Sequence, residues 1–155
     1  MSTTEVGAPA PDFDSASTAG DRQTLGDLKG SKLVLYFYPK DSTPGCTLEG
    51  QNFRDMHDEF TAANAIILGV SRESIRSHDN FRARQNFPFH LLSDPEETLC
   101  KAYDVIKEKS MYGRKYMGIE RSTFLIDEEG VLRREWRKVK VKGHAEEVLE
   151  AVREL

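Results

Sequence analysis

The stretch from Leu33 to Ala63 constrains the fold of this chain more than any other part. It begins with an apolar, aromatic run, Leu33 to Tyr38, which is closed by Pro39 and is typical of a buried β-strand. Apolar side chains then recur at helical spacing from Thr47 to Ala63. A turn rich in proline and glycine joins the two segments and ends at Cys46. This order of strand, turn, cysteine and helix predicts that Cys46 lies in the first turn of a helix.

That position bears directly on the chemistry of Cys46. The backbone N–H groups of a first helical turn have no partner inside the helix, and the positive end of the helix dipole lies there. Both effects favour the thiolate, which is the nucleophilic form of cysteine. A second interpretation remains open, because a free cysteine is often a small buried hydrophobic residue.

The spacing of the turn resembles a known signature. Pro39, Thr43 and Cys46 match the pattern P-x-x-x-[TS]-x-x-C of the peroxiredoxins, and the wider string Tyr36 to Thr47 is similar to their bacterioferritin-comigratory, or Q-type, branch. The resemblance implies that Cys46 is the peroxidatic nucleophile and that the Thr43 hydroxyl serves both the sulfur and the peroxide. It also implies that Pro39 shields the site from water.

A second resemblance concerns a cation. Residues 118–126 are similar to the family pattern G-I-x-R-x-T-F-x-I, which implies that Arg121 lies beside the reactive sulfur. A guanidinium there would favour the thiolate and donate hydrogen bonds of fixed geometry. Glu49, one helical turn after Cys46, is a candidate to hold Arg121 in place, although an exposed helical glutamate is an equally good interpretation.

The chain departs from the usual Q-type pattern in its second cysteine. Family members carry the resolving cysteine five residues after the first one or on the next helix, and these positions here are Gln51 and Arg82. Only Cys100 remains. It is either a packed core thiol or a resolving cysteine that is reached by local unfolding of the first helix. Without a resolving cysteine, an external thiol would reduce the sulfenic acid directly.

The rest of the chain alternates strands and helices. Strands are expected over 65–71, 87–92, 122–127 and 131–139. Helices are expected over 73–86 and over 144–155, and a third helix has Asp94 as its N-cap, Pro95 as its first residue and runs through 106. Short irregular strands precede them, and the basic segment from Lys107 to Tyr116 is interpreted as a loop. The pattern predicts an α/β three-layer sandwich with a mixed central sheet, which resembles the thioredoxin fold with the N-terminal hairpin of peroxiredoxins.

Composition limits the possible functions. A length of 155 residues predicts a single domain over 1–155, and a net charge of −4 argues against binding to nucleic acid or to an anionic membrane. No signal peptide or membrane-spanning run is visible, and two cysteines without a disulfide framework suit the cytoplasm. The four histidines show no zinc-ligand spacing, so no metal is expected.

By resemblance, the expected activity is reduction of hydrogen peroxide and organic hydroperoxides in antioxidant defence. Electrons would come from thioredoxin or a similar thiol reductant, without a cofactor, and the protein would be a monomer. The alternative is a non-catalytic thioredoxin-fold protein, either a redox sensor or a holdase. Cys46 would be dispensable for a holdase, and a sensor would need Cys46 but turn over poorly.

Overall fold

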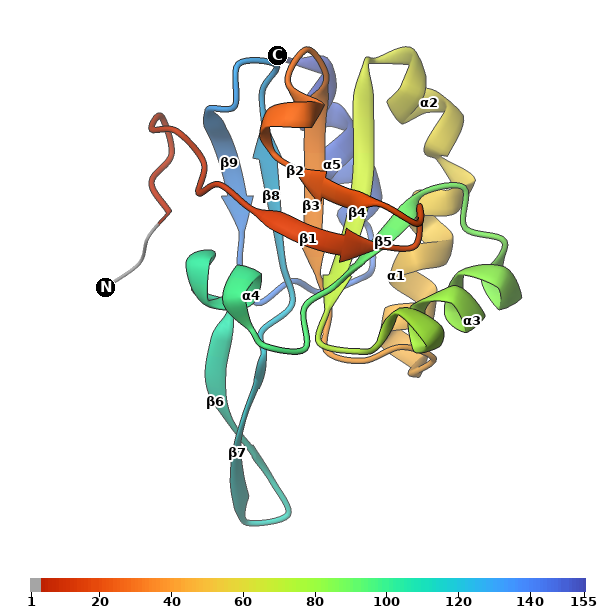
Figure 1. The fold of residues 1–155 in the computed structure, drawn as a ribbon, viewed down its shortest axis with the longest axis vertical. Helices are drawn as coiled ribbons and strands as arrows, with labels where there is room; N and C mark the ends of the chain where they lie inside the picture. The colour runs from red at the N-terminus through yellow and green to blue at the C-terminus, as the bar shows by residue number, and fades with distance from the viewer. Residues whose placement is uncertain (1–3) are drawn as a thin grey trace.

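The computed structural model describes residues 4–155, and a seven-stranded mixed sheet forms its centre. The strand order is β2-β1-β5-β4-β3-β8-β9, with β3 parallel to β4 and β4 parallel to β5 (Figure 1). The strands are β1 (Asp14–Ser17), β2 (Arg22–Thr24), β3 (Lys32–Phe37), β4 (Ala65–Ser71), β5 (His90–Ser93), β8 (Ser122–Ile126) and β9 (Leu132–Trp136). The predicted thioredoxin-like sandwich with an N-terminal β1–β2 hairpin is confirmed.

Helices and a separate hairpin complete the fold. The helices are α1 (Pro44–Asp55), α2 (His57–Ala62), α3 (Ile75–Gln85), α4 (Thr98–Ala102) and α5 (His144–Arg153), with a 3₁₀ turn η1 (Gly26–Leu28). The two-stranded hairpin consists of β6 (Ile106–Met111) and β7 (Arg114–Ile119), and it projects from one end of the molecule (Figure 1). None of the helices over residues 4–155 is long and apolar enough to cross a membrane.

Two hydrophobic clusters lie on opposite faces of the sheet. Residues alternate along β3 because successive side chains of a strand point to opposite faces, so Val34 and Tyr36 join one cluster and Leu35 and Phe37 join the other. The first cluster includes side chains of α1, α2, α3 and α5, and the second includes those of α4 and the N-terminal segment. This separation places Cys46 and Cys100 on opposite sides of the sheet.

The ends of several elements differ from the sequence predictions. The helix predicted over Thr47–Ala63 is interrupted at Met56, whose φ of −107° and ψ of 6° separate α1 from α2. The strand predicted over 87–92 begins only at His90. The helix predicted to start at Pro95 starts at Thr98, although Asp94 still accepts hydrogen bonds from the first-turn N–H groups of Leu99 and Cys100.

The loop predicted from Lys107 to Tyr116 was wrong, because this segment forms the β6–β7 hairpin. Tyr112 and Gly113 both have positive φ, of 52° and 77°, and make the two-residue turn that suits a hairpin. The two strands were not predicted because most of their side chains are exposed, so the sequence lacks the alternation of apolar and polar residues that identifies a strand.

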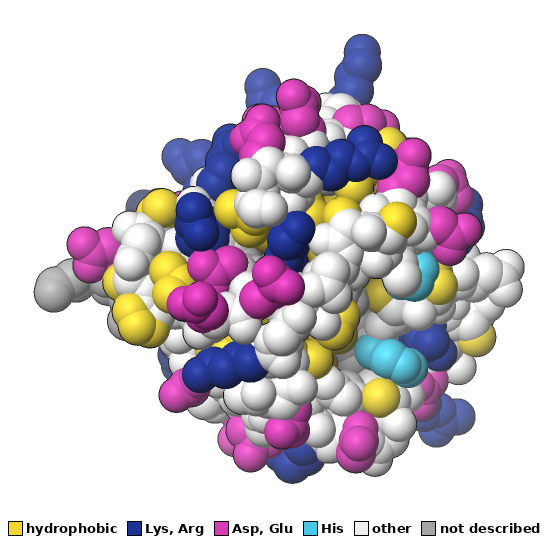
Figure 2. Space-filling view, turned by 90° about the horizontal axis from the view of Figure 1, so that it is seen from above, with side chains coloured by type: hydrophobic (Ala, Val, Ile, Leu, Met, Phe, Trp, Pro, Cys, Tyr) yellow, Lys and Arg dark blue, Asp and Glu magenta, His cyan; other side chains and the backbone are white. Residues whose placement is uncertain are grey.

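At the end of the molecule opposite this hairpin, the surface charges are of both signs. Figure 2 looks down on that end and shows lysine and arginine side chains intermixed with aspartate and glutamate. Its small apolar hollow is lined by, among others, Ile66, Phe89 and His90. Cys46 lies at the other end, at the carboxyl ends of parallel strands β3 and β4.

Candidate active site

The loop after β3 presents Cys46 as the third residue of α1. Pro44 and Gly45 occupy the first two helical positions, and the Thr43 side chain makes no capping hydrogen bond. The N–H groups of Gly45 and Cys46 therefore stay available as donors at the helix start. Cys46 itself is only 2% exposed and belongs to the hydrophobic core. The predicted position of the cysteine in the first turn of a helix is confirmed.

Arg121 lies beside the sulfur, as the resemblance implied. Its Nη2 donates to Cys46 Sγ at 3.4 Å, and its Nη1 donates to Glu49 Oε1 at 2.6 Å. Gly45 permits this approach, since a Cβ atom at that position would lie 3.2 Å from Nη2. One guanidinium thus joins the thiol and the carboxylate, with its fork geometry fixing both contacts.

Glu49 is a buried carboxyl, not an exposed helical glutamate. It is 1% exposed, and burial raises its pKa to about 7 even though the charge and hydrogen bond of Arg121 lower it. Within residues 4–155, its Oε2 atom and the Tyr36 hydroxyl are buried without a hydrogen-bond partner. The charges of Glu49 and Cys46 help burial to raise the pKa of Tyr36. The site is therefore poor in water and sensitive to each added charge.

Thr43 and Pro39 lie on the same loop. The Thr43 hydroxyl donates to the carbonyl oxygen of Lys40 at 2.7 Å. Because its proton is committed there, the hydroxyl can offer an approaching peroxide a lone pair as an acceptor. Pro39 is half-buried and lines a shallow hollow with Lys40 and Arg72.

A buried polar network anchors this loop, and the sequence did not reveal it. Asp41 accepts hydrogen bonds from Tyr38 Oη at 2.6 Å and from Ser77 Oγ at 2.7 Å. His78 Nδ1 lies 2.7 Å from Asp41 Oδ2, and its Nε2 lies 2.8 Å from the carbonyl oxygen of Leu92. A carbonyl only accepts, so Nε2 donates to it.

Asp41 and His78 therefore form a buried ion pair. Burial raises the pKa of Asp41, but the hydrogen bond and charge of His78 outweigh that effect and hold the pKa below its ordinary value. The pair links the cysteine loop to α3 across 37 residues, a distance over which the sequence contained no pairing signal.

Cys100 is not brought near this site. It is fully buried in the second cluster, and its backbone N–H donates to Asp94. Burial raises the pKa of the Cys100 thiol strongly, and the hydrogen bond and charge of Asp94 raise it further. The raised pKa favours the unreactive thiol form. The positions of the usual resolving cysteines hold side chains with polar contacts. Gln51 donates to Gln85, and Arg82 donates to the carbonyl of Phe89.

Over residues 4–155, no three His, Cys, Asp or Glu side chains gather in a way that could hold a metal ion.

His144 is part of the core behind the site, where its Nε2 lies 2.8 Å from Thr123 Oγ1. Burial lowers the pKa of His144 to about 4.

Comparisons with known proteins show what this chain is similar to. The family model described as the AhpC/TSA family matches residues 6–135. Peroxiredoxin Bcp of Xanthomonas campestris pv. campestris is 56% identical over 147 residues, covering 94% of this chain and 92% of that protein. Peroxiredoxin Bcp of Bacillus subtilis is 51% identical over 153 residues, covering 99% and 98%. A solved structure of Xanthomonas campestris peroxiredoxin Q is 54% identical, has a TM-score of 0.90 and covers 99% of this chain and 97% of its own.

A second solved structure adds an activity. It is the Xanthomonas campestris bacterioferritin comigratory protein, studied for its alkyl peroxide reduction activity, at 52% identity and a TM-score of 0.89. It covers 99% of this chain and 98% of its own.

Proposed function

Because this chain belongs to the AhpC/TSA family and is a peroxiredoxin, we propose that Cys46 is the residue that attacks the hydroperoxide. The chain is a thiol peroxidase, and the remaining question is which side chains perform each step. One observation carries the assignment. The Arg121 guanidinium lies 3.4 Å from Cys46 Sγ and is held on its other side by the buried Glu49.

In the first step, the Cys46 thiolate attacks the terminal oxygen of the hydroperoxide. The S–O bond forms as the O–O bond breaks, which leaves a sulfenic acid on Cys46 and an alkoxide that takes up a proton to become an alcohol, or water from hydrogen peroxide. Arg121 and the free N–H groups of Gly45 and Cys46 stabilise the developing negative charge on oxygen. Thr43 accepts from the peroxide O–H and so orients it, and Pro39 covers the site against water.

In the second step, a thiol reductant attacks the sulfenic acid, releases water and leaves a mixed disulfide that a further thiol resolves. We propose that this reductant is an external thiol, with thioredoxin or a similar protein as the donor. Support comes from Cys100, which lies on the opposite side of the sheet from Cys46 and has a raised pKa. A Cys46–Cys100 disulfide would require the two Cα atoms to come within about 7 Å, hence extensive unfolding.

Other parts of the proposal follow from the same site. The reaction as written uses no metal or organic cofactor. Alkyl hydroperoxides are proposed as substrates beside hydrogen peroxide because of the activity studied in the Xanthomonas relative. We also propose that the enzyme is cytoplasmic and monomeric and that residues 1–155 act as one domain. Support comes from the two free, buried cysteines and from the two hydrophobic clusters, which share one sheet. A redox sensor or holdase is not favoured.

Two matched cysteine variants test the assignment. Cys46→Ser should abolish peroxide consumption with dithiothreitol as reductant, whereas Cys100→Ser should retain it at a rate close to that of the unmodified enzyme. Retained turnover in Cys46→Ser would remove Cys46 as the nucleophile. Loss of turnover in Cys100→Ser, with an unchanged circular dichroism spectrum, would show instead that Cys100 resolves the sulfenic acid.

A further inference from the structure

The β6–β7 hairpin projects from the same end of the molecule as the active site. Four of the seven large hydrophobic side chains that are exposed over residues 4–155 lie on it, namely those of Met111, Tyr112, Tyr116 and Met117. Tyr112, at the tip, is 99% exposed. Exposed apolar side chains gathered on a small surface mark a site of interaction, whereas scattered ones do not.

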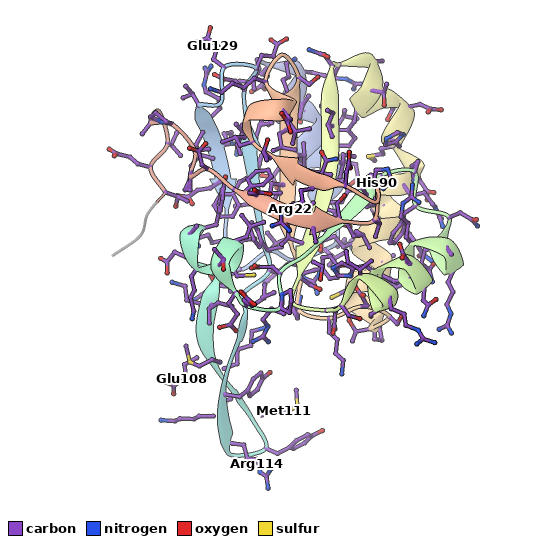
Figure 3. All side chains as sticks on the ribbon, in the orientation of Figure 1. Arg22, His90, Glu108, Met111, Arg114 and Glu129 are labelled. Atoms are coloured by element: carbon purple, nitrogen blue, oxygen red, sulfur yellow. The ribbon has the colours of Figure 1, made fainter. Side chains whose placement is uncertain are left out.

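The strand register separates the hairpin into two faces. Lys109 is opposite Tyr116 and Met111 is opposite Arg114, so these residues share a face with Lys107, which we call the near face. Glu108, Ser110, Lys115 and Met117 share the other, which we call the far face. Figure 3 shows Met111 and Glu108 on opposite sides of the hairpin.

The near face lies toward the end of the hairpin that leads to the site, and its Lys109 is within electrostatic reach of Cys46. Strand β7 ends at Ile119, and Arg121, whose Nη2 contacts Cys46 Sγ, follows two residues later. At the base of the hairpin, the side chains of Tyr116 and Lys109 close over Gly118, since a Cβ there would lie 3.2 Å and 3.3 Å from them. Burial and the charge of Arg121 lower the pKa of Lys109, and the charge of Cys46 raises it, so Lys109 lies within electrostatic reach of the site.

The charges of the near face indicate the character of its partner. The chain as a whole has a net charge of −4, yet the near face contains Lys107, Lys109 and Arg114 and no acidic residue. Lys107 is paired with Asp104 at 3.2 Å, outside the hairpin strands. Complementary charge speeds encounter and excludes wrong partners. A second copy of this chain would bring two cationic near faces together, which disfavours a symmetric dimer through this surface.

A protein reductant must dock where its own sulfur can reach Cys46 Sγ. Cys46 is almost fully buried, and a mixed disulfide requires a sulfur–sulfur bond of about 2.05 Å. A protein thiol that reaches Cys46 therefore has to approach the end of the molecule from which the hairpin projects, where Lys109 is within electrostatic reach of the sulfur. We propose that the near face is the docking surface for an acidic protein thiol reductant, whose apolar side chains pack on Met111 and Tyr116. The proposal rests on the function assigned to Cys46 above.

Two double variants test it. Arg114→Glu with Tyr116→Ser changes the near face, and Lys115→Glu with Met117→Ser makes the same change of charge and a similar loss of apolar surface on the far face. For each protein, the rate of reduction of peroxide-treated enzyme would be measured with reduced bacterial thioredoxin and with dithiothreitol. We expect the near-face variant to lose about 10-fold or more of the thioredoxin rate and much of its salt dependence. The dithiothreitol rate, the peroxide step and the far-face variant should be nearly unchanged.

Several outcomes would overturn the proposal. Equal thioredoxin rates in the near-face and far-face variants would do so, as would a wild-type enzyme that dithiothreitol reduces and thioredoxin does not. Loss in the near-face variant of binding to anionic phospholipid vesicles, at an unchanged thioredoxin rate, would assign the hairpin to a membrane instead. If neither reductant restored activity to wild-type enzyme, the assigned function itself would fail.

Discussion

Arg121 Nη2 lies 3.4 Å from Cys46 Sγ although the two residues are 75 positions apart in the chain. The contact exists because β8 pairs with β3, so that the start of β8 lies beside the loop that follows β3. The same guanidinium is held by Glu49, which is buried one helical turn after the cysteine. The sulfur, the cation and the carboxylate therefore form one electrostatic unit, and changes to its members should have different effects.

Replacement of Arg121 by alanine should slow the peroxide step by roughly 10–100-fold, the effect of losing a charged hydrogen-bond donor at a reacting centre. Arg121→Lys should recover only part of this, because an ammonium cannot hold the sulfur and Glu49 with one planar fork. Stopped-flow measurement of enzyme oxidation by hydrogen peroxide would give the rates. An Arg121→Ala enzyme as fast as the unmodified one would exclude a role for the guanidinium.

Glu49 predicts a specific pH dependence. Its pKa is about 7, so below neutral pH it is largely protonated and no longer offers Arg121 a competing negative charge. Glu49→Gln makes that state permanent and keeps an oxygen to accept from Arg121. We expect the acid limb of the pH–rate profile for peroxide reduction to move to lower pH in this variant. A shift to higher pH would mean that an ionised Glu49 is needed to hold Arg121.

The ion pair of Asp41 and His78 should be a large contributor to the order of the cysteine loop. Asp41→Asn removes one partner of this buried pair, and we expect the free energy of unfolding to fall by about 3–5 kcal/mol. Adding His78→Gln removes the other partner of the pair as well and should restore part of the loss. Ser42→Ala, on the same loop at an exposed residue, is the control. Urea unfolding would measure these proteins together with His78→Gln alone, and additive losses in the two single variants and the double variant would argue against a coupled pair.

His144 should make the fold sensitive to acid. Its pKa is about 4 in the folded state and about 6.5 in the unfolded chain, so between these values the unfolded state binds more protons. Stability from this residue is therefore complete above about pH 6.5 and is lost as the pH falls toward 4. The drop in unfolding free energy between pH 7.5 and pH 4.5 should be smaller in His144→Gln than in the unmodified protein. An equal drop in His144→Gln and in the unmodified protein would refute the assignment.

Some features could be predicted because they depend on local pattern. The run Leu33–Tyr38 is apolar enough to identify a strand, and the proline and glycine before Cys46 identify a turn into a helix. The place of Arg121 was predicted through resemblance to a family pattern, since no spacing in one chain brings the residue before β8 to the start of α1. The roles of Cys46, Arg121, Thr43, Pro39 and Glu49 in the reaction remain predictions.

Other features depend on tertiary contacts that leave no local trace. The β6–β7 hairpin is exposed on both faces, so its sequence lacks the apolar alternation that identifies a strand. The Asp41–His78 pair joins a turn to a helix through side chains that look like ordinary surface residues in sequence. The start of α4 lies three residues after Pro95 because Glu97 adopts a left-handed φ of 64° immediately before the helix.

The most direct test of the central claim is the intact mass of fully reduced enzyme after one equivalent of hydrogen peroxide, with Cys46→Ser treated in parallel. The account predicts a gain of one oxygen atom in the unmodified enzyme, no gain in Cys46→Ser, and loss of the added oxygen when an external thiol is supplied. Loss of two hydrogen atoms within a single chain would show an internal Cys46–Cys100 disulfide and contradict the external-thiol cycle. The same gain of oxygen in Cys46→Ser would contradict Cys46 as the nucleophile.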